Sequence, residues 1–344
     1  MTSTTPNEAI IIPAAKAPLE IILVETYTPG PKELLIRNEA IALNPAEWKI
    51  AKLGIFPLNY PVISGFSFGG TVTSIGSSVT RFQVGDRVAA SMYFPPKQGN
   101  QYGGYQKFVV VGEETAAKVP DAVDIATGAA LTGNLTTVVG IFEGRLGLGK
   151  PDFEKGVVGK GEKVLVYGGS SSLGSLSVQY VAQAGYEVVT TSSPRNMGWV
   201  SGLGATAVVD HTLGDEETAK ALIERGPYVA VVDTISLEDT ILVNKKVLDA
   251  QGGGTLFGVA VSAEDKIPEG LTYESMSWPA ILHEERNAGL MSWSFHEYLE
   301  QALAKGKLIT PPIEKIGGGL KGVQVALDKL EKGVSGVKLV VDPR

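Results

Sequence analysis

The residues best suited to chemistry form a short glycine- and serine-rich turn near the middle of the chain. The apolar run Val164–Tyr167 is typical of a buried strand and leads directly into the turn Gly168–Gly174. From Leu176 onward apolar residues recur at helical spacing, and Gly185 is placed to end that helix. Free backbone N–H groups at a helix N-terminus attract anions, so this stretch predicts a phosphate-binding site.

The turn matches the dinucleotide-binding fingerprint in part. Gly169 and Gly174 fit its first and third glycines, while Ser171 stands where the second is expected. A small hydroxyl can donate to a phosphate, so the serine suits such a site but makes the pattern less specific. We therefore expect the turn to contact the phosphates of a dinucleotide through Gly169, Ser170, Ser171, Ser172 and Leu173.

The next strand, Tyr186–Ser192, ends where an acidic residue would hold the ribose hydroxyl of NAD. No acid is present there. The chain instead offers Ser192, Ser193, Arg195 and Asn196, whose hydroxyls and guanidinium suit a 2′-phosphate. This favours NADPH as the cofactor, and the alternative is an ordinary surface arginine in a polar loop.

Strands continue to alternate with polar, helix-like stretches further along the chain. The strands are Ala207–His211, Val229–Thr234 and Gly254–Ala260, and Asp215–Arg225 and Leu237–Ala250 lie between them. The alternation predicts an α/β fold with a doubly wound parallel sheet, which binds ligands beyond the carboxyl ends of its strands. The strand-end residues expected to line the cofactor site are Ser192, His211, Asp233, Thr234, Gly258, Val259 and Ala260.

Composition sets the class of protein. A length of 344 residues favours two domains, and 44% hydrophobic residues are ample for large cores. The net charge of −7 argues against nucleic acid and anionic membranes as partners. No apolar run approaches the length of a membrane span, and the polar start lacks the features of a signal peptide. With no cysteine there is no disulfide or thiolate chemistry, and we expect a cytoplasmic enzyme.

The two ends of the chain have a different pattern. Short strands separated by turns predict a β-rich barrel or sandwich before about residue 130. These strands are Ile21–Glu25, Glu33–Ala42, Gly69–Ser74, Asp86–Ala90 and Gln106–Val111. After about residue 295 the pattern predicts helices at Phe295–Ala304 and Leu320–Leu330 and a last strand at Val337–Val341.

Ordered motifs along nearly the whole chain resemble the medium-chain dehydrogenase/reductase superfamily. They begin with Asn44–Lys49, Gly65–Val72 and Val84–Val88. They continue with Gly168–Gly174, Ser193–Asn196, Leu203–Ala205 and Ser335–Val341. The branch that the chain is most similar to is the zinc-independent one of quinone oxidoreductases and fungal trans-acting enoyl reductases.

The resemblance implies two domains and a cofactor. A GroES-like catalytic domain, residues 1–130 and 295–344, would surround a Rossmann NADPH-binding domain, residues 131–294. In this family NADPH lies in the cleft between them. The resemblance also implies cofactor contacts by Asn44, Pro45 and Lys338, and it places Thr136 or Thr137 beside the nicotinamide at the start of a helix, Thr136–Leu146.

Two departures from relatives bear on the chemistry. Zinc-dependent members carry a cysteine and a Gly-His-Glu motif, but here the motif is replaced by Gly65-Phe66-Ser67 and cysteine is absent. We therefore expect no metal. Mitochondrial-type enoyl reductases carry a catalytic tyrosine in a Tyr-Pro pair, and Phe56-Pro57 occupies that place. The catalytic residues stay unknown, with Asn44, Trp48, Phe56, Thr136 and Thr137 as candidates for the pocket.

Several of these residues also have a purely structural interpretation. Asn44 would then be a turn residue, Trp48 a core aromatic, and Lys338 a surface lysine before a strand. His211 is at a strand end where relatives carry a tyrosine near the 2′-phosphate, which favours an adenosine-side contact. We expect His283 and His296 to be solvated, and Tyr60, Tyr93, Tyr102 and Tyr105 to be phenols in cleft loops.

These observations predict an NADPH-dependent reductase of the C=C bond of an enone or polyketide-like enoyl substrate, belonging to secondary metabolism. A carbonyl or alcohol oxidoreductase is the second interpretation, although neither a metal nor an acid is evident to stabilise an alkoxide. A third is a non-catalytic NADPH-binding partner of a biosynthetic complex. The chain offers Gly289–Trp293 as an edge strand for a homodimer, and a polyketide synthase is the other expected partner.

Overall fold

The computed structural model describes residues 6–56, 58–92, 99–259 and 267–344. The chain divides into two compact units. Unit 1 comprises Met1–Gly133 and Met291–Arg344, and unit 2 comprises Asn134–Leu290. Unit 1 is thus built from both ends of the chain, and the first division falls inside one helix, α2, Ile125–Val139.

Unit 1 is organised around a mixed sheet in the order β14-β15-β3-β4-β5-β7, with β6 also paired to β3. A separate antiparallel pair joins β1 to β2. The strands are β1 Asn7–Ile11, β2 Glu20–Val24, β3 Glu33–Ala42, β4 Ser67–Ile75, β5 Arg87–Ser91, β6 Phe108–Gly112, β7 Ala116–Lys118, β14 Ile313–Ile316 and β15 Lys338–Val341.

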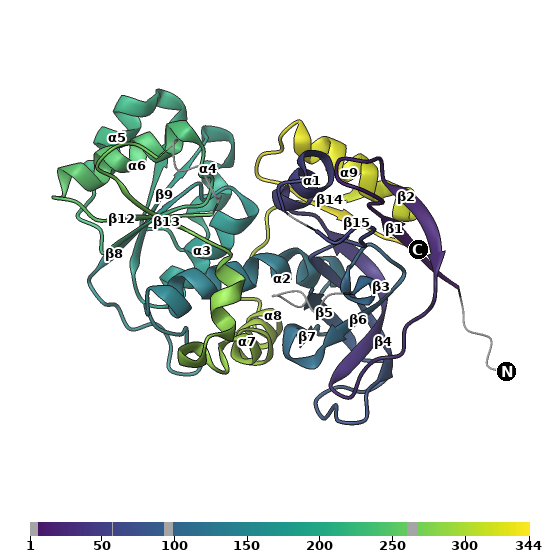
Figure 1. Cartoon of the computed structure of the whole chain (residues 1–344). Helices are drawn as coiled ribbons and strands as arrows, with labels where there is room; N and C mark the ends of the chain where they lie inside the picture. The colour runs from purple at the N-terminus through teal and green to yellow at the C-terminus, as the bar shows by residue number, and fades with distance from the viewer. Residues whose placement is uncertain (1–5, 57, 93–98, 260–266) are drawn as a thin grey trace. The chain divides into compact units, whose positions relative to one another are not determined.

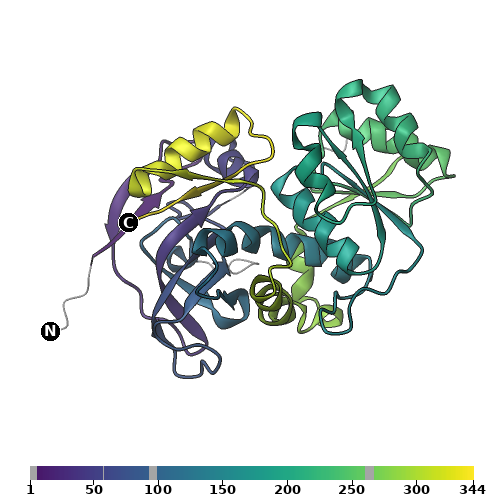
Figure 2. The ribbon, with the colours of Figure 1, turned by 180° about the vertical axis from the view of Figure 1, so that it is seen from behind.

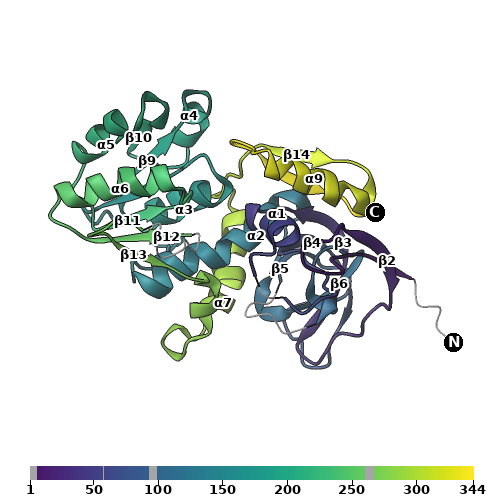
Figure 3. The same ribbon diagram turned by 45° about the horizontal axis from the view of Figure 1, so that its top comes forward.

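The C-terminal segment completes the core of unit 1. Strand β15 pairs with β14 in parallel and with β3 in antiparallel register, so the end of the chain lies in the same sheet as its beginning. Helices α1, Pro45–Leu53, and α9, Gly322–Glu331, pack against each other beside these strands (Figures 1 and 3). Apolar residues of α1, α9 and β15 share one buried cluster, which accounts for the stability of this corner.

Unit 2 contains a parallel six-stranded sheet in the order β10-β9-β8-β11-β12-β13. Helices cover both faces of the sheet, as Figure 2 shows, which confirms the predicted doubly wound fold. The strands are β8 Lys163–Tyr167, β9 Glu187–Ser192, β10 Ala207–Asp210, β11 Ala230–Asp233, β12 Thr255–Gly258 and β13 Thr272–Ser275. The helices are α3 Ser172–Gln183, α4 Pro194–Ser201, α5 Asp215–Ile223 and α6 Glu238–Ala250.

Helix α2 begins earlier in the chain than the sequence predicted. It begins at Ile125, where Asp124 accepts a hydrogen bond from the Ala126 N–H at 3.0 Å, and a π-helical turn extends it to Arg145. The predicted start at Thr136 was wrong because the glycines in this stretch interrupt the helical pattern in the sequence without ending the helix.

The same helix is the one segment of the described residues that is long and apolar enough to cross a membrane, by length and composition alone. Its most apolar window has a mean hydropathy of 1.4, but 72% of that window is buried inside the protein. The sequence expectation that no such run exists was therefore wrong. Core helices of soluble proteins meet the same test, so the feature is weak support for a membrane span.

The stretch Gly289–Trp293 is not an edge strand. Leu290–Trp293 forms helix α7, which continues through a π-helical turn, Ser294–Leu299, into α8, Glu300–Ala304. Gly289 has a φ of +83°, which ends the preceding turn and lets the helix begin. The structure thus removes the strand that the sequence offered for dimer pairing.

Candidate active site

The glycine turn of unit 2 connects β8 to α3 as predicted. Gly168 has a φ of +91°, a left-handed conformation that favours glycine. A side chain on Gly174 would overlap the Gly168 carbonyl oxygen, and one on Gly169 would overlap the Thr190 hydroxyl. The backbone of the turn therefore packs closely against itself and against β9.

This turn has the features that a dinucleotide phosphate requires. The N–H groups of Ser172 and Leu173 open helix α3 and have no acceptor within the described chain. Helix α3 is 12 residues long, so its dipole adds to their attraction for an anion. Asn134 of α2 donates to the Ser172 hydroxyl at 2.6 Å and fixes this end of the helix. The residues present thus fit a bound phosphate.

Ser171 lies in the predicted turn, directly before helix α3. Its hydroxyl accepts a hydrogen bond from the Gly174 N–H at 2.9 Å and caps helix α3. It also lies 3.2 Å from the Thr234 hydroxyl. Its main contribution is therefore to shape the turn, and a phosphate contact by its side chain stays a proposal.

The end of β9 carries a free guanidinium. Ser193 precedes α4, Arg195 lies in its first turn, and Asn196 is buried beneath with its amide 3.4 Å from the Ser193 hydroxyl. The Arg195 side chain is exposed and makes no ion pair or hydrogen bond with the described residues. Strand β9 ends in Ser192 and not in an acidic residue. Asp210 of the neighbouring β10 lies opposite Ser192, and its carboxylate accepts hydrogen bonds from the Thr212 N–H and hydroxyl.

The parallel register brings the other predicted cofactor residues to the same edge. Asp233 of β11 lies opposite Tyr167 of β8 and Gly258 of β12. Thr234 follows β11 and donates to the Tyr167 carbonyl at 2.8 Å, while the Val259 N–H donates to the Ser236 hydroxyl at 2.9 Å. His211 follows β10 and is exposed. Ala260 lies outside the described residues.

Asp233, predicted to line the site, is wholly buried. Burial raises the pKa of its carboxyl, while hydrogen bonds from Thr240, Ser236 and Ile235 act in the opposite direction. The carboxylate thus accepts three hydrogen bonds from the loop that follows β11 and from the start of α6, and it organises that loop.

Unit 1 contains a buried polar network around Asn44, which precedes helix α1. Lys338 Nζ donates to Asn44 Oδ1 at 2.6 Å. Asn44 Nδ2 donates to Glu47 Oε2 and to Ser67 Oγ, each at 3.1 Å. Both amide hydrogens are thus used inside the unit, and Asn44 is 6% exposed. Asn44 is therefore the N-cap of α1 and the centre of a buried network, more than the turn residue of the structural interpretation, and its nicotinamide-side contact stays a prediction.

Glu47 is the residue that the sequence interpretation missed. One of its oxygens accepts from the Asn44 N–H at 2.6 Å, and the other accepts from the Phe66 N–H and the Tyr105 hydroxyl, each at 3.0 Å. Burial raises the pKa of its carboxyl, and burial beside Glu47 raises that of Tyr105 well above the usual value. Glu47 follows Asn44 by three residues, the spacing of a capping box, which was the available signal.

Lys338 is not the surface lysine of the alternative interpretation. It is 2% exposed and opens β15, whose four residues are all buried. Burial lowers its pKa to about 8, and the Glu47 charge opposes this effect. The lysine and the carboxylate thus share a dry site in which each charge depends on the other.

The remaining pocket candidates lie against the core, at the surface or inside helix α2. Trp48 packs against the core cluster of unit 1, and Phe56 is 44% exposed just before Pro57, which lies outside the described residues. Thr136 is buried and Thr137 half-buried, both inside α2.

His296 departs from the expectation of a solvated side chain, and two of the tyrosines expected in cleft loops are buried. His296 is half-buried, with its Nε2 2.8 Å from the Glu113 carbonyl. Tyr102 is buried and donates to Glu33 at 2.9 Å, and Tyr105 donates to Glu47. His283 is exposed, as expected. Tyr93 lies outside the described residues.

Within the part of the chain that the structure describes, no group of three or more His, Cys, Asp or Glu side chains is arranged to hold a metal ion. Position 66 is Phe and position 67 is Ser, and Ser67 is engaged by Asn44. The donor set that a zinc ion prefers is not assembled by these residues.

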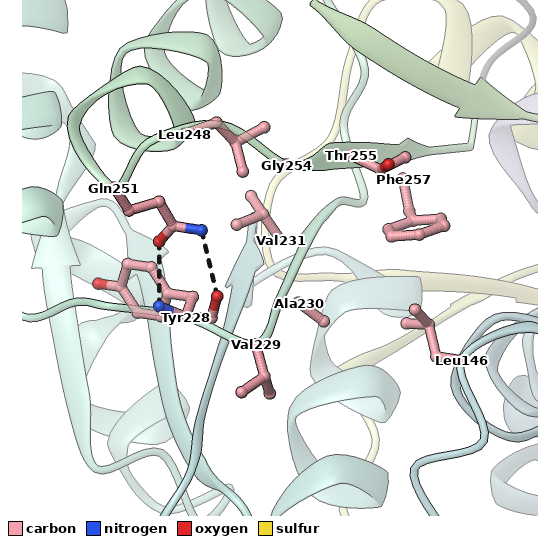
Figure 4. Close-up of a pocket in the computed structure, with 10 residues that line it drawn as sticks. All are labelled: Leu146, Tyr228, Val229, Ala230, Val231, Leu248, Gln251, Gly254, Thr255 and Phe257. Atoms are coloured by element: carbon pink, nitrogen blue, oxygen red, sulfur yellow. Dashed lines mark hydrogen bonds between the residues drawn. The ribbon is translucent and has the colours of Figure 1, made fainter.

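A cavity of about 210 Å³ lies in unit 2 but away from the turn (Figure 4). Ala230 and Thr255, the first residues of β11 and β12, line it, so it opens at the amino ends of the strands. Gln251 closes one side by hydrogen bonds to the Tyr228 N–H at 3.0 Å and carbonyl at 3.2 Å. Ligands of such sheets bind at the opposite edge, so this cavity is not the cofactor site.

Comparison with known proteins gives consistent similarities. Residues 30–121 match the family described as alcohol dehydrogenase GroES-like domain. The chain is 32% identical to the trans-enoyl reductase himH of Aspergillus japonicus, over 90% of this chain and 89% of that protein. It is 31% identical to the dehydrogenase azaJ of Aspergillus niger, over 97% and 98%. The quinone oxidoreductase of Pseudomonas syringae has a similar structure, with a TM-score of 0.73, 25% identity and coverage of 98% and 100%.

Proposed function

This chain belongs to the medium-chain dehydrogenase/reductase family of oxidoreductases, and from that premise we propose that it reduces the C=C bond of an enone or enoyl substrate with NADPH and without zinc. The fold of this family implies a nicotinamide dinucleotide cofactor. The choice of NADPH and the choice of an alkene as substrate are the steps that need argument.

The observation that carries the cofactor choice is the free Arg195 guanidinium just after β9, a strand that ends in serine and not in an acidic residue. A carboxylate there would bind a ribose 2′-hydroxyl and repel a 2′-phosphate. Arginine does the opposite, because its planar fork can donate two hydrogen bonds to a phosphate. The Ser193 hydroxyl beside it adds a further donor.

The binding of the dinucleotide would use the chain's own backbone and hydroxyls. The Ser172 and Leu173 N–H groups would hold the pyrophosphate at the start of α3. Thr234, His211 and Val259 follow neighbouring strands, Gly258 ends β12, and these four residues at the same edge would line the rest of the dinucleotide. In unit 1, Asn44 is the residue we assign to the nicotinamide side, through the one lone pair of Oδ1 that its network leaves free.

The proposed chemistry depends on the nicotinamide cofactor and on the absence of a tyrosine at position 56. The reduced nicotinamide, when bound, supplies a hydride to the β-carbon of the alkene. Negative charge then develops on the carbonyl oxygen, where hydrogen-bond donors stabilise it. We assign the proton of the α-carbon to water, because Phe56 stands where some relatives have a tyrosine.

The choice of an alkene rests on the relatives. Those named trans-enoyl reductase include himH and, at 31% identity over 97% of this chain, tndF of Aspergillus flavipes. A carbonyl reductase is the second candidate, because similar proteins are named dehydrogenase. It would need a metal or an acid to stabilise a forming alkoxide, and the described residues do not assemble a metal site.

The test is a steady-state assay of the purified protein with NADPH and a panel of enones and enoyl thioesters, followed by product identification. We expect NADPH consumption and a saturated ketone or thioester. An allylic alcohol would support the carbonyl reductase instead. Tight NADPH binding without turnover, together with a co-purifying synthase, would support a non-catalytic partner. Cytoplasmic location and association with a polyketide synthase stay predictions.

A further inference from the structure

Lys338 is a buried cation that the proposed reaction does not yet use. Its Nζ makes one hydrogen bond, to Asn44 Oδ1, and the other two N–H bonds meet no acceptor in the described residues. A buried ammonium with unused donors is costly, and one that is retained in a dry site calls for an explanation beyond packing.

Few charged groups lie close enough to Lys338 to affect its pKa. Glu47 on α1 is the charged group that faces it, and Tyr105 donates to the far side of Glu47. Ser67 on β4 reaches the network as a neutral hydroxyl. The charged residues of the adjoining β14 and α9 are instead paired at the surface, as Glu314 with Lys329, Lys315 with Asp124, and Asp328 with Lys52.

The hydrogen bonds fix the Asn44 amide in one orientation. Its Nδ2 faces the Glu47 carboxylate and the Ser67 hydroxyl, and its Oδ1 faces the ammonium. A flipped amide would place Nδ2 against the Lys338 ammonium and Oδ1 against the Glu47 carboxylate, which makes two like-signed contacts in a buried site. Gly133 of α2 adds a steric limit, because a side chain there would overlap Ser67.

We propose that Lys338 is a positioning residue of the cofactor site, which acts through Asn44 and does so only while its amine is protonated. This inference rests on the proposed function, because Asn44 is the residue we assign to the nicotinamide side. One lone pair of Asn44 Oδ1 accepts the hydrogen bond from the Lys338 ammonium. While this bond is present, the second lone pair keeps its direction toward the nicotinamide side.

Deprotonation would loosen this arrangement. A charge-assisted hydrogen bond from an ammonium is about twice as strong as one from a neutral amine. Loss of the positive charge also leaves Glu47 as an uncompensated buried anion, next to the amide that must keep its position. Because burial lowers the pKa of Lys338 to about 8, the change falls within the range of an ordinary binding experiment.

The test measures the NADPH dissociation constant by cofactor fluorescence between about pH 7 and pH 9. If only the protonated form binds and the pKa is about 8, the dissociation constant of the wild type should rise about tenfold over this range. Binding near pH 8 should then take up protons, which calorimetry in buffers of different ionisation enthalpy detects.

Three variants separate positioning from structure. K338M should bind more weakly, with no pH dependence over this range. K338R should keep tight binding up to the highest pH, because a guanidinium stays charged. E47Q should move the midpoint to lower pH, since the Glu47 charge favours the protonated lysine. K315M, at an exposed lysine of the neighbouring β14, is the matched control and should behave as the wild type.

The inference is overturned if wild-type affinity does not change with pH, or if K338M or K338R keeps the wild-type pH dependence. If K338M does not fold, the shift in E47Q and the flat profile of K338R decide the question. Failure of the proposed reaction is a separate result. A wild type that binds NADPH with this pH dependence but reduces no alkene contradicts the reaction and leaves the role of Lys338 intact.

Discussion

Arg195 is the single side chain on which the choice of cofactor depends. It lies in the first turn of α4, exposed and unpaired among the described residues, directly after a strand that ends in serine. Replacing it should therefore affect the cofactor that carries a 2′-phosphate and spare the one that does not. The distinction is one of charge and donor geometry, and the fold should be unaffected.

We expect R195A to lower kcat/KM for NADPH about 10- to 100-fold, the range for a lost hydrogen bond to a charged group, with kcat/KM for NADH changed little. Parallel steady-state measurements with both cofactors test this. R286A is the matched control, at an exposed arginine of unit 2 that is paired with Glu284. An R195A enzyme that loses activity equally with both cofactors would contradict the assignment.

Lys338 predicts the pH dependence of stability as well as of binding. Its pKa is about 8 when folded and returns to about 10.5 on unfolding, so between these values the unfolded chain binds more protons. Stability from this group therefore rises with pH across that range, by at most about 3 kcal/mol. Cofactor affinity should instead fall as the pH rises over the same range.

Denaturant titrations of the wild type and K338M at several pH values from about 7 to 10 measure this difference. We expect the free energy of unfolding of the wild type, minus that of K338M, to increase with pH. A difference that stays constant would show that Lys338 does not titrate in this range. A difference that decreases would contradict the direction of its pKa shift.

At the scale of elements, the β8–α3 turn depends on close backbone contact. A methyl group on Gly174 would overlap the Gly168 carbonyl, whereas Gly198 inside α4 has open space around it. We expect G174A to weaken cofactor binding and lower the free energy of unfolding. G198A should raise the free energy of unfolding by about 0.5–1 kcal/mol, because alanine is a better helix former than glycine. Thermal unfolding with and without NADPH compares the two, and equal effects would contradict this account of the turn.

Much of the fold could be predicted from local patterns. Strand β3 and the β8–α3 turn follow from apolar runs and glycines that lie close together in the sequence. The start of α2 was missed because Gly128 and Gly133 read as helix breakers, although both are required where the helix packs closely against its neighbours. The stretch after Gly289 was too short for its period to distinguish strand from helix.

The buried network of unit 1 could not be predicted in the same way. Asn44 and Glu47 are close in sequence, but Lys338 joins them from 294 residues away. Lysines are mostly exposed, so its burial follows from the pairing of β15 with β3 and β14, which no local pattern reports. The resemblance to a family indicated that this lysine matters, and the structure shows which side chains it contacts.

At the scale of the whole molecule, unit 1 needs both ends of the chain and unit 2 does not. Removal of residues 336–344 would take β15 from between β14 and β3 and leave Glu47 without its cation. We expect hydrogen exchange to show lost protection in β3 and β4 while β8 and β11 keep theirs. Loss of protection in both units, or in neither, would contradict this expectation.

The central claim is that hydride goes from NADPH to the β-carbon of an activated alkene. The most direct measurement supplies NADPH that carries deuterium at the transferable position, together with an enone, and locates the label in the product by NMR. We expect a saturated ketone with deuterium at the β-carbon and unlabelled solvent hydrogen at the α-carbon. Deuterium on the carbinol carbon of an allylic alcohol would contradict the account.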